Sequence, residues 1–490
     1  MKKIIQFVII PAFLLFMAAG CKKILEVKQQ SSITEEIYFK NEGDFEPYVT
    51  GIYTFMRSLA NNITYGTERS EELVAASNSR FGVAWSQIIT PSSGAVNYNE
   101  WYRGIGHCNL LLARIADFQF SSPDVKKRIV AETFCLRAYL YFHLTRVIGD
   151  APLMLEAVTD ENVKLLARSP AADVMKQIQS DLDTAIASFR SLSNFSVRTY
   201  PSKYRFSYGS AQALKADAKL WSAKVLGGGN ADFTDAITAI TEVEASGVIL
   251  NTDFKNVTGI RAATNPEIIL GAFYQRDETS VGANYALNAL PFLSIVQGAL
   301  NLDSLPYAQT SANGQGAYQI SPKSRALFTS STDKRIPFTW VTERQSTGAK
   351  IAWITKYLGT KYPDDRISDN DLIIYRLADL LLMKAEAYAG LNNTALAIDY
   401  LNKVRVRAGT GNYTGATTKA EVEKEILDER GRELFFENKR WFDLVRFHKG
   451  GTINVYTYVP NLVGKTTPLF WPLNTTVLAG NNKITQTQGY

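Results

Sequence analysis

Residues 382–404 read LMKAEAYAGLNNTALAIDYLNKV, and this stretch decides the fold. Its first half places small Ala residues where two helices can cross closely. Its second half repeats Ala, Leu and Tyr at helical spacing, and a Leu-Asn turn separates the two halves. This combination is typical of a tetratricopeptide-like helix pair, in which a helix rich in small residues packs against a second, amphipathic helix.

Two other stretches repeat this helix core. Residues 136–142 read LRAYLYF and residues 214–221 read LKADAKLW, and each leads into a turn and a second amphipathic segment. The spacing between pairs is irregular, so the sequence predicts a mostly α fold, a degenerate α/α superhelix that carries insertions. The expected helices span residues 100–118, 131–147, 173–189, 210–225, 233–245, 372–389 and 394–408.

The insertions are rich in loops and in aromatic side chains. Residues 61–99 and 247–370 are irregular, and the second segment has frequent Gly, Ser, Thr, Asn and Pro and strand-like runs at 268–270 and 351–354. Flat aromatic rings stack on sugar rings and are frequent binding hot spots, although core packing is the more common role for any one ring taken singly. The candidate ligand-binding residues are Phe81, Trp85, Tyr98, Tyr285, Tyr307, Tyr318 and Trp340.

The N-terminus has the anatomy of a secretory signal. Lys2 and Lys3 precede an apolar run over residues 4–19, which is shorter than a membrane-spanning helix. Small residues at 18–20 precede Cys21 and resemble a bacterial lipobox, with Ala18 in place of the usual Leu. We therefore expect residues 1–20 to be a lipoprotein signal peptide and Cys21 to carry the lipid; ordinary secretion is the alternative.

Composition limits the chemistry that the chain can perform. Hydrophobic residues make up 46% and charged residues 20%, which is ordinary for a globular protein. The net charge of +6 is mild and no long basic run occurs, so we expect no nucleic-acid partner. Three Cys and three well-separated His predict neither a disulfide scaffold nor a metal site, and no cofactor motif is present. Cys108 and Cys135 fall in helical patterns and are expected to be buried thiols.

An acidic cluster near the C-terminus raises the possibility of glycosidase chemistry. Glu429, Glu433 and Glu437 recur at i,i+4 spacing, which would place each pair on one helical face. A glycosidase needs one carboxyl with a raised pKa. Arginines are interleaved with these acids and would hold them ionised, so we interpret the cluster as a structural salt-bridge lattice and expect no enzyme. An exported glycosidase is the alternative.

The chain as a whole resembles the SusD/RagB family of outer-membrane lipoproteins from Bacteroidetes. The resemblance rests on Cys21 followed by ILEV at 24–27, on WYRGIGHCN at 101–109 and on AETFCLRAYLYFHLTR at 131–146. It continues through RLADLLLMKAEA at 376–387, the acidic cluster and the terminal QGY at 488–490. Two departures are Glu26, where the family commonly has Asp, and Gln29, where it commonly has Pro.

The resemblance implies both an architecture and a role. It implies four tetratricopeptide-like helix pairs with a loop-rich second part containing short strands. The expected divisions are a helical region at 21–246 and a RagB/SusD region at 247–490, loop-rich over 247–370 and helical over 372–446, in one interleaved unit. It also implies a lipid-anchored protein that faces the cell exterior, binds an oligo- or polysaccharide and acts with a SusC-like TonB-dependent transporter. A peptide-binding or protein-adaptor role is the alternative.

Overall fold

The fold was analysed in a computed structural model of the chain. The structure describes residues 38–75, 82–158, 164–198, 202–276, 285–289, 318–344, 346–348 and 350–490. The chain divides into a unit Met1–Asp44 and a unit Phe45–Tyr490. In the first unit, Asp44 closes the short helix η2 (Glu42–Asp44) by accepting hydrogen bonds from the backbone of Lys40 and Asn41. The predicted signal peptide and Cys21 lie outside the described residues.

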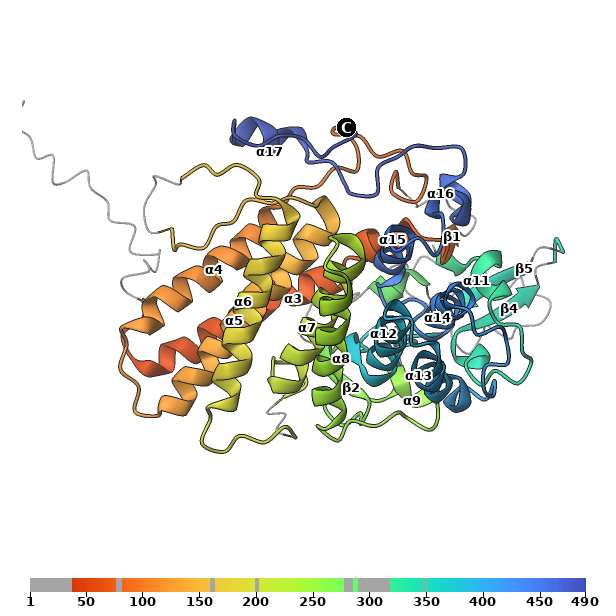
Figure 1. The fold of residues 1–490 in the computed structure, drawn as a ribbon, viewed down its shortest axis with the longest axis horizontal. Coiled ribbons are helices and arrows are strands. Elements are labelled where there is room, and N and C mark those ends of the chain that lie inside the picture. Colours follow the sequence, from red (N-terminus) through yellow and green to blue (C-terminus); the bar gives the residue numbers. More distant parts are fainter. Residues whose placement is uncertain are drawn as a thin grey trace, which may run out of the picture. The chain divides into compact units, whose positions relative to one another are not determined.

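The second unit is built on four helix pairs, as the resemblance implied. The pairs are α3 (Phe45–Ala60) with α4 (Asn99–Ala116), α5 (Pro123–Ile148) with α6 (Ala171–Arg190), α7 (Tyr208–Val225) with α8 (Gly229–Glu244), and α12 (Leu377–Gly390) with α13 (Thr394–Arg407). The second helix of each pair packs on the first helix of the next, as in tetratricopeptide arrays (Figure 1). The predicted α/α fold class is confirmed.

The local sequence explains where these helices begin and how deeply they are buried. Ser207 and Ser210 form a reciprocal capping box at the start of α7. Helix α5 is buried over most of its circumference because other helices pack around it. Helix α12 packs on α8, which brings together segments that residues 247–370 separate in sequence. Cys108 and Cys135 are buried free thiols, as predicted.

Two expectations about the helices were wrong or incomplete. Residues 372–376, expected at the start of a helix, form strand β8 (Leu372–Arg376), which pairs antiparallel with β2 (Ile268–Ala272). A short, fully buried apolar run suits a strand as well as a helix, and the β-branched Ile373 and Ile374 favour the strand. Helix α3 was not identified from the sequence, although its buried residues recur at helical spacing.

The acidic cluster spans a helix, a turn and a second helix. Helix α14 (Lys419–Glu433) packs on α12 and α13, and α15 (Arg440–Lys449) packs on α14 and α7. Because α14 ends at Glu433, the expectation that Glu433 and Glu437 share one helical face was wrong. The connecting turn contains Phe436 and Asn438, whose φ angles are +60° and +58°, so the chain reverses there and cannot continue the helix.

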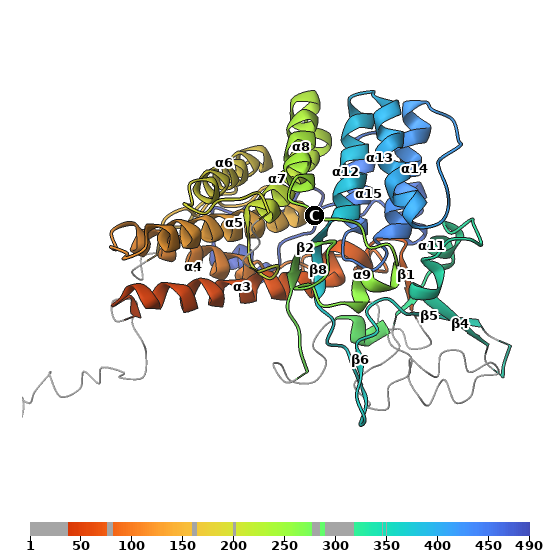
Figure 2. The same ribbon diagram turned by 90° about the horizontal axis from the view of Figure 1, so that it is seen from below.

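The loop-rich part forms a four-stranded antiparallel sheet beside these helices. Its order is β1 (Leu73–Ala75), β3 (Tyr318–Ile320), β5 (Lys350–Ile354) and β4 (Trp340–Arg344). The strand-like runs predicted at 268–270 and 351–354 are confirmed as parts of β2 and β5. A small hairpin joins β6 (Thr360–Lys361) to β7 (Arg366–Ile367). Figure 2 shows α12, α13 and α14 side by side, with β4, β5 and β6 on one side of them.

Shorter elements complete the unit. They are the π-helix η3 (Thr64–Glu68), α9 (Lys255–Gly259), η4 (Tyr285–Ala289), α11 (Pro322–Ala326), η6 (Ile336–Phe338), α16 (Val455–Tyr458), η7 (Pro460–Leu462) and α17 (Thr475–Gly480). The fully buried Arg69, next to η3, holds the C-terminal segment in place. Its guanidinium stacks on Trp441 and Trp471 and donates to the carbonyls of Pro468 and Leu469. Within the described residues, no helix is long and apolar enough to span a membrane.

Candidate functional site

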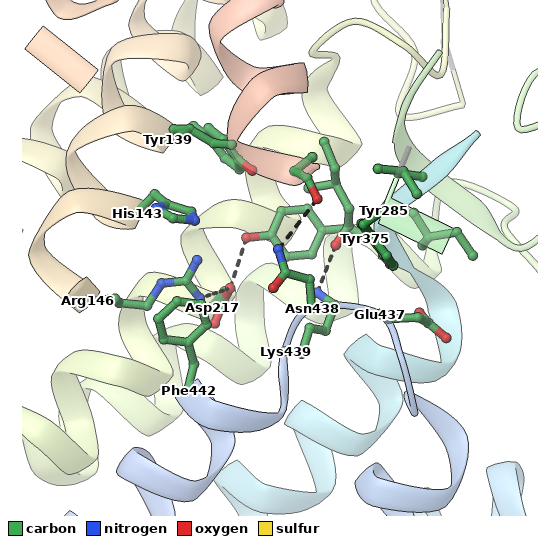
Figure 3. Close-up of a pocket in the computed structure, with 15 residues that line it drawn as sticks. Tyr139, His143, Arg146, Asp217, Tyr285, Tyr375, Glu437, Asn438, Lys439 and Phe442 are labelled. Carbon is green, nitrogen blue, oxygen red and sulfur yellow. Dashed lines mark hydrogen bonds and ion pairs between the residues drawn. The ribbon is translucent and has the colours of Figure 1, made fainter. Parts of the chain in front are cut away.

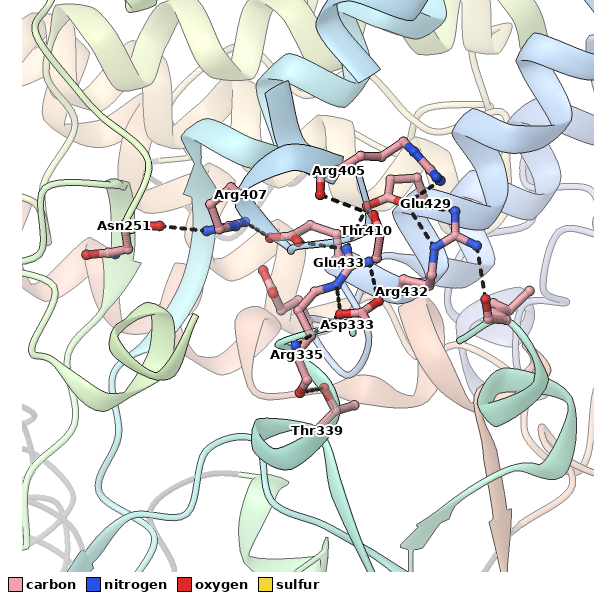
Figure 4. A network of polar contacts seen from close by, with 12 residues as sticks. Asn251, Asp333, Arg335, Thr339, Arg405, Arg407, Thr410, Glu429, Arg432 and Glu433 are labelled. Atoms are coloured by element: carbon pink, nitrogen blue, oxygen red, sulfur yellow. Dashed lines mark hydrogen bonds and ion pairs between the residues drawn. The ribbon is translucent and has the colours of Figure 1, made fainter. Parts of the chain in front are cut away.

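The acidic cluster is the centre of a buried ionic network (Figure 4). Arg335 contacts Glu429 at 2.7 Å and Glu433 at 3.0 Å. Arg376 contacts Glu433 at 2.6 Å and Glu437 at 2.7 Å. All five side chains are 0% exposed, so each charge depends on the others to replace the water it has lost.

The network holds its carboxylates in the ionised form. Burial alone would raise the pKa of Glu433, but Arg407, Arg376 and Arg335 outweigh this effect and lower it well below the usual range. The pKa values of Glu429 and Glu437 are also lowered, because Arg335 and Arg376 respectively outweigh burial. A glycosidase acid needs the opposite shift, so this geometry supports the structural interpretation of the cluster.

A second buried group of side chains surrounds a small cavity between α3, α5, α7, β8 and α15 (Figure 3). Arg146 pairs with Asp217 at 3.3 Å, and the Tyr375 hydroxyl donates to Asp217 at 2.9 Å. Burial and the neighbouring Arg146 lower the pKa of His143 to about 3, so its ring stays neutral. The cavity measures about 50 Å³, which is room for a few waters and too small for a sugar ring.

Three of the candidate aromatic residues meet at the four-stranded sheet. Gln319 pairs with Trp353, and Trp353 pairs with Val341, so these three residues share one face. Because side chains alternate along a strand, Tyr318 and Trp340 share the other face. The Trp85 indole donates its N–H to the carbonyl of Leu73 in β1 at 3.0 Å, which places Trp85 against the same sheet.

Trp85 and Trp340 are only partly buried, and contacts with the protein fix both rings. The hydrogen bond to Leu73 orients the Trp85 indole. Trp340 meets the ring of Phe328 edge to face, with centroids 4.8 Å apart. β1 and β4 are the two outer strands of the sheet, so Trp340 and the Leu73 carbonyl that holds Trp85 belong to strands separated by three interstrand spacings of about 4.8 Å.

Tyr318 and one further candidate, Tyr285, are packed inside the protein. Tyr285 is 6% exposed, and its hydroxyl donates to the carbonyl of Phe436 at 2.8 Å. Tyr318 is 9% exposed, and its hydroxyl donates to Glu68 at 3.3 Å. Both rings meet Phe436 edge to face, so they support the sheet from within. Phe81 and Tyr307 lie outside the described residues.

Tyr98 lies apart from the sheet. It lines a cavity of about 260 Å³ formed with Pro152, Met154, residues 164–166 and α17. The structure therefore distributes the described candidates over the sheet surface, the core and a separate pocket. Among the described residues, no group of three or more His, Cys, Asp and Glu side chains is arranged to hold a metal.

A third cavity, at the base of the β4–β5 hairpin, was not predicted from the sequence. It measures about 470 Å³ and is lined in part by Arg261, Phe338, Asp369 and Asp371. Arg261 contacts Asp371 at 3.2 Å and Asp369 at 3.6 Å, so its charge is already paired with these two carboxylates. Its walls come from segments far apart in the chain, and no local pattern connects them.

The pKa of one buried acid near the sheet is raised, whereas the pKa values of the carboxylates in the ionic network are lowered. Glu72 directly precedes β1 and accepts a hydrogen bond from the backbone of Phe436 at 3.3 Å. Burial raises the pKa of Glu72 to about 8, partly opposed by Arg440 and reinforced by Glu71. Glu72 lines none of the three cavities. We therefore interpret it as a structural residue that is protonated near neutral pH.

Comparison with known proteins gives the family. A profile described as "SusD family" matches residues 342–490, and one described as "Starch-binding associating with outer membrane" matches residues 23–214. SusD-like protein P38 of Formosa agariphila is 25% identical, over 98% of both chains. Starch-binding protein SusD of Bacteroides thetaiotaomicron is 30% identical over 133 residues, which are 25% of this chain and 22% of that protein.

Solved structures of similar proteins point to the same family. NanU of B. fragilis superposes with a TM-score of 0.80 and 28% identity, covering 95% of this chain and 100% of that one. A laminarin-binding SusD-like protein has the same fold, with a TM-score of 0.73, 22% identity and coverage of 92% and 100%. The resemblance seen in the sequence is thereby confirmed. The chain belongs to the SusD/RagB family of SusD-like, starch- and glycan-binding proteins that associate with the outer membrane.

Proposed function

We propose that the protein is a cell-surface lipoprotein that binds an oligo- or polysaccharide without cleaving it. Cys21 carries the lipid that anchors it to the outer membrane, facing the cell exterior. A SusC-like TonB-dependent transporter receives the glycan and imports it. Membership of the family, and the similarity to a starch-binding SusD, support the ligand class.

One observation carries the proposed binding site: two partly exposed indoles are fixed at opposite edges of one sheet. A ring that is already oriented loses little rotational freedom when a sugar stacks on it, so more of the contact energy appears as affinity. The two outer strands are about 14 Å apart, three interstrand spacings, and this exceeds the width of a single sugar ring. We infer that the ligand is a chain of several sugars that touches both indoles.

This site is tested by measuring affinity as a function of glycan length. Trp85→Ala and Trp340→Ala should each weaken binding of hexasaccharides by about tenfold or more, since aromatic residues dominate binding energy. Each variant should also bind a hexasaccharide little better than the matching disaccharide. Tyr413→Ala is the matched control, because Tyr413 is also half-buried but lies on the loop after α13 and belongs to none of the four strands of the sheet. If all three variants bind every tested glycan as tightly as the wild type does, a peptide-binding or adaptor role is favoured.

The partner is tested on native membranes. Mild detergent extraction, followed by purification through a C-terminal tag, should recover the protein together with a TonB-dependent transporter of the outer membrane. Recovery of the protein alone would contradict the proposed role in import. Cys21→Ala tests the anchor, because loss of the acyl chains should release the protein from the membrane fraction. Continued retention of this variant in the membrane would contradict lipid anchoring.

A further inference from the structure

The pocket that contains Tyr98 is separate from the indoles on the sheet. Its walls come from the start of α4, from Pro152 and Met154, from residues 164–166 and from α17. Figure 1 shows α17 on the opposite side of the view from strands β4 and β5, and Figure 2 also places α4 far from β4. A ligand in this pocket would therefore not touch Trp340.

The floor of the pocket is apolar and fixed by hydrogen bonds. Tyr98 is half-buried and meets Tyr102 edge to face, with centroids 4.7 Å apart. The Tyr102 hydroxyl donates to the carbonyl of Pro152 at 2.8 Å. The Tyr141 hydroxyl accepts from the backbone N–H of Met154 and donates to its carbonyl, both at 2.8 Å. Segment 152–154 is thus held against the helices, and the floor exists before any ligand binds.

The rim of the pocket carries exposed polar side chains. The side chains of Asn99, Lys164 and Thr476 line the pocket and are exposed. Within the described part of the chain, they form no hydrogen bond or ion pair with another residue. Asn481 differs, because its amide donates to the carbonyl of Leu166 and accepts from the backbone of Lys483. The rim therefore offers an amide, a hydroxyl and an ammonium group to a ligand without breaking internal contacts.

We propose that this pocket is a second carbohydrate subsite, which takes one neutral sugar ring. A pyranose has apolar C–H faces and a border of hydroxyls, which matches an aromatic and aliphatic floor below a polar rim. Among the described residues that line the pocket, Lys164 is the one charged residue, and the otherwise uncharged lining suits a neutral ring. The volume of about 260 Å³ suits one ring, whereas Arg261 at the 470 Å³ cavity already pairs with Asp371.

The proposal rests on the proposed glycan-binding function, and a calorimetric titration separates the two. The probes are five hexasaccharides: maltohexaose, laminarihexaose, cellohexaose, xylohexaose and mannohexaose. The proteins are the wild-type mature chain, Tyr98→Ala, Thr476→Val and the double variant Trp85→Ala/Trp340→Ala. Circular dichroism and thermal melting confirm that each variant is folded. Thr476→Val removes one rim hydroxyl at nearly constant shape, so it tests the pocket without disturbing the floor.

The expected result is two binding events for the wild-type chain with at least one probe. Tyr98→Ala should lose the weaker binding event and keep the stronger one. Thr476→Val should weaken the weaker event several-fold. The double variant Trp85→Ala/Trp340→Ala should keep only the weaker event. If Tyr98→Ala and Thr476→Val match the wild type in both stoichiometry and affinity, the second subsite is refuted while the proposed function stands. If the wild-type chain binds none of the five probes, both proposals fail.

Discussion

Glu433 is a fully buried carboxylate that Arg335, Arg376 and Arg407 keep ionised. The sequence interleaves acids and arginines here, and that pattern was sufficient to predict a salt-bridge lattice. The pattern was not sufficient to predict that these charged side chains are buried. Arg335 and Arg376 come from the loop-rich segment and from β8, so the lattice ties α14 to distant parts of the chain and is not a surface ladder on one helix.

Removing the charge of Glu433 should destabilise the protein strongly. Glu433→Gln leaves three guanidinium groups without their shared partner, and breaking a buried pair costs about 3–5 kcal/mol. The folded pKa of Glu433 is lowered, so its stabilisation is present above its unfolded pKa and is lost as the pH falls. Urea unfolding should show the variant's deficit at neutral pH and a smaller deficit in acid. A deficit that does not change with pH would contradict this account.

Glu72 should have the opposite pH dependence. Its folded pKa of about 8 lies above its ordinary value of 4.5, so the folded state binds the proton more tightly. The stabilisation is complete below the unfolded pKa and is lost as the pH rises through about 8. The free energy of unfolding of the wild type should therefore fall relative to Glu72→Gln between about pH 5 and 8. A difference that is constant over this range would show that Glu72 is ionised in the folded protein.

At the scale of elements, helices were easier to predict than strands and sites. Helix α5 and the pair α12–α13 repeat apolar and small residues over several turns, so their periodicity is readable from one sequence. β8 is a run of five residues and was mistaken for helix. The sheet that carries Trp85 and Trp340 joins residues 73–75, 318–320 and 340–354, and no local pattern encodes pairing between such distant segments.

The close approach of η3 to the turn between α14 and α15 gives a test at this scale. A Cβ on Gly66 would collide with the backbone carbonyl of Asn438. Asn438 itself is held by its side chain, which donates to the carbonyl of Asn62 at 3.0 Å. Gly66→Ala should therefore destabilise the protein by about 1–3 kcal/mol, as overpacking does.

A second glycine provides the matched control for this substitution. Gly106 lies within α4, and a Cβ there meets nothing within 4 Å. Gly106→Ala should be neutral or stabilise by up to about 1 kcal/mol, because Ala is the better helix former. Thermal melting of both variants decides the question. Equal melting temperatures would refute the tight packing inferred between η3 and the turn.

At the scale of the whole molecule, we propose that residues 21–246 and 247–490 fold as one interleaved unit. Helix α8 of the first region packs on α12 of the second, and β1 of the first pairs with β3 of the second. Neither region buries these surfaces alone. Urea unfolding should therefore show one cooperative transition by both fluorescence and circular dichroism. Two separated transitions, or a stable isolated fragment 21–246, would contradict a single unit.

We propose that a glycan chain binds across the sheet and touches both Trp85 and Trp340. The most direct measurement is a crystal structure of the mature chain in complex with the hexasaccharide that it binds most tightly in calorimetry. We expect sugar rings stacked on both indoles, with the glycan running from the β1 edge to the β4 edge. Sugar density at other places on the protein, with neither indole covered, would contradict it.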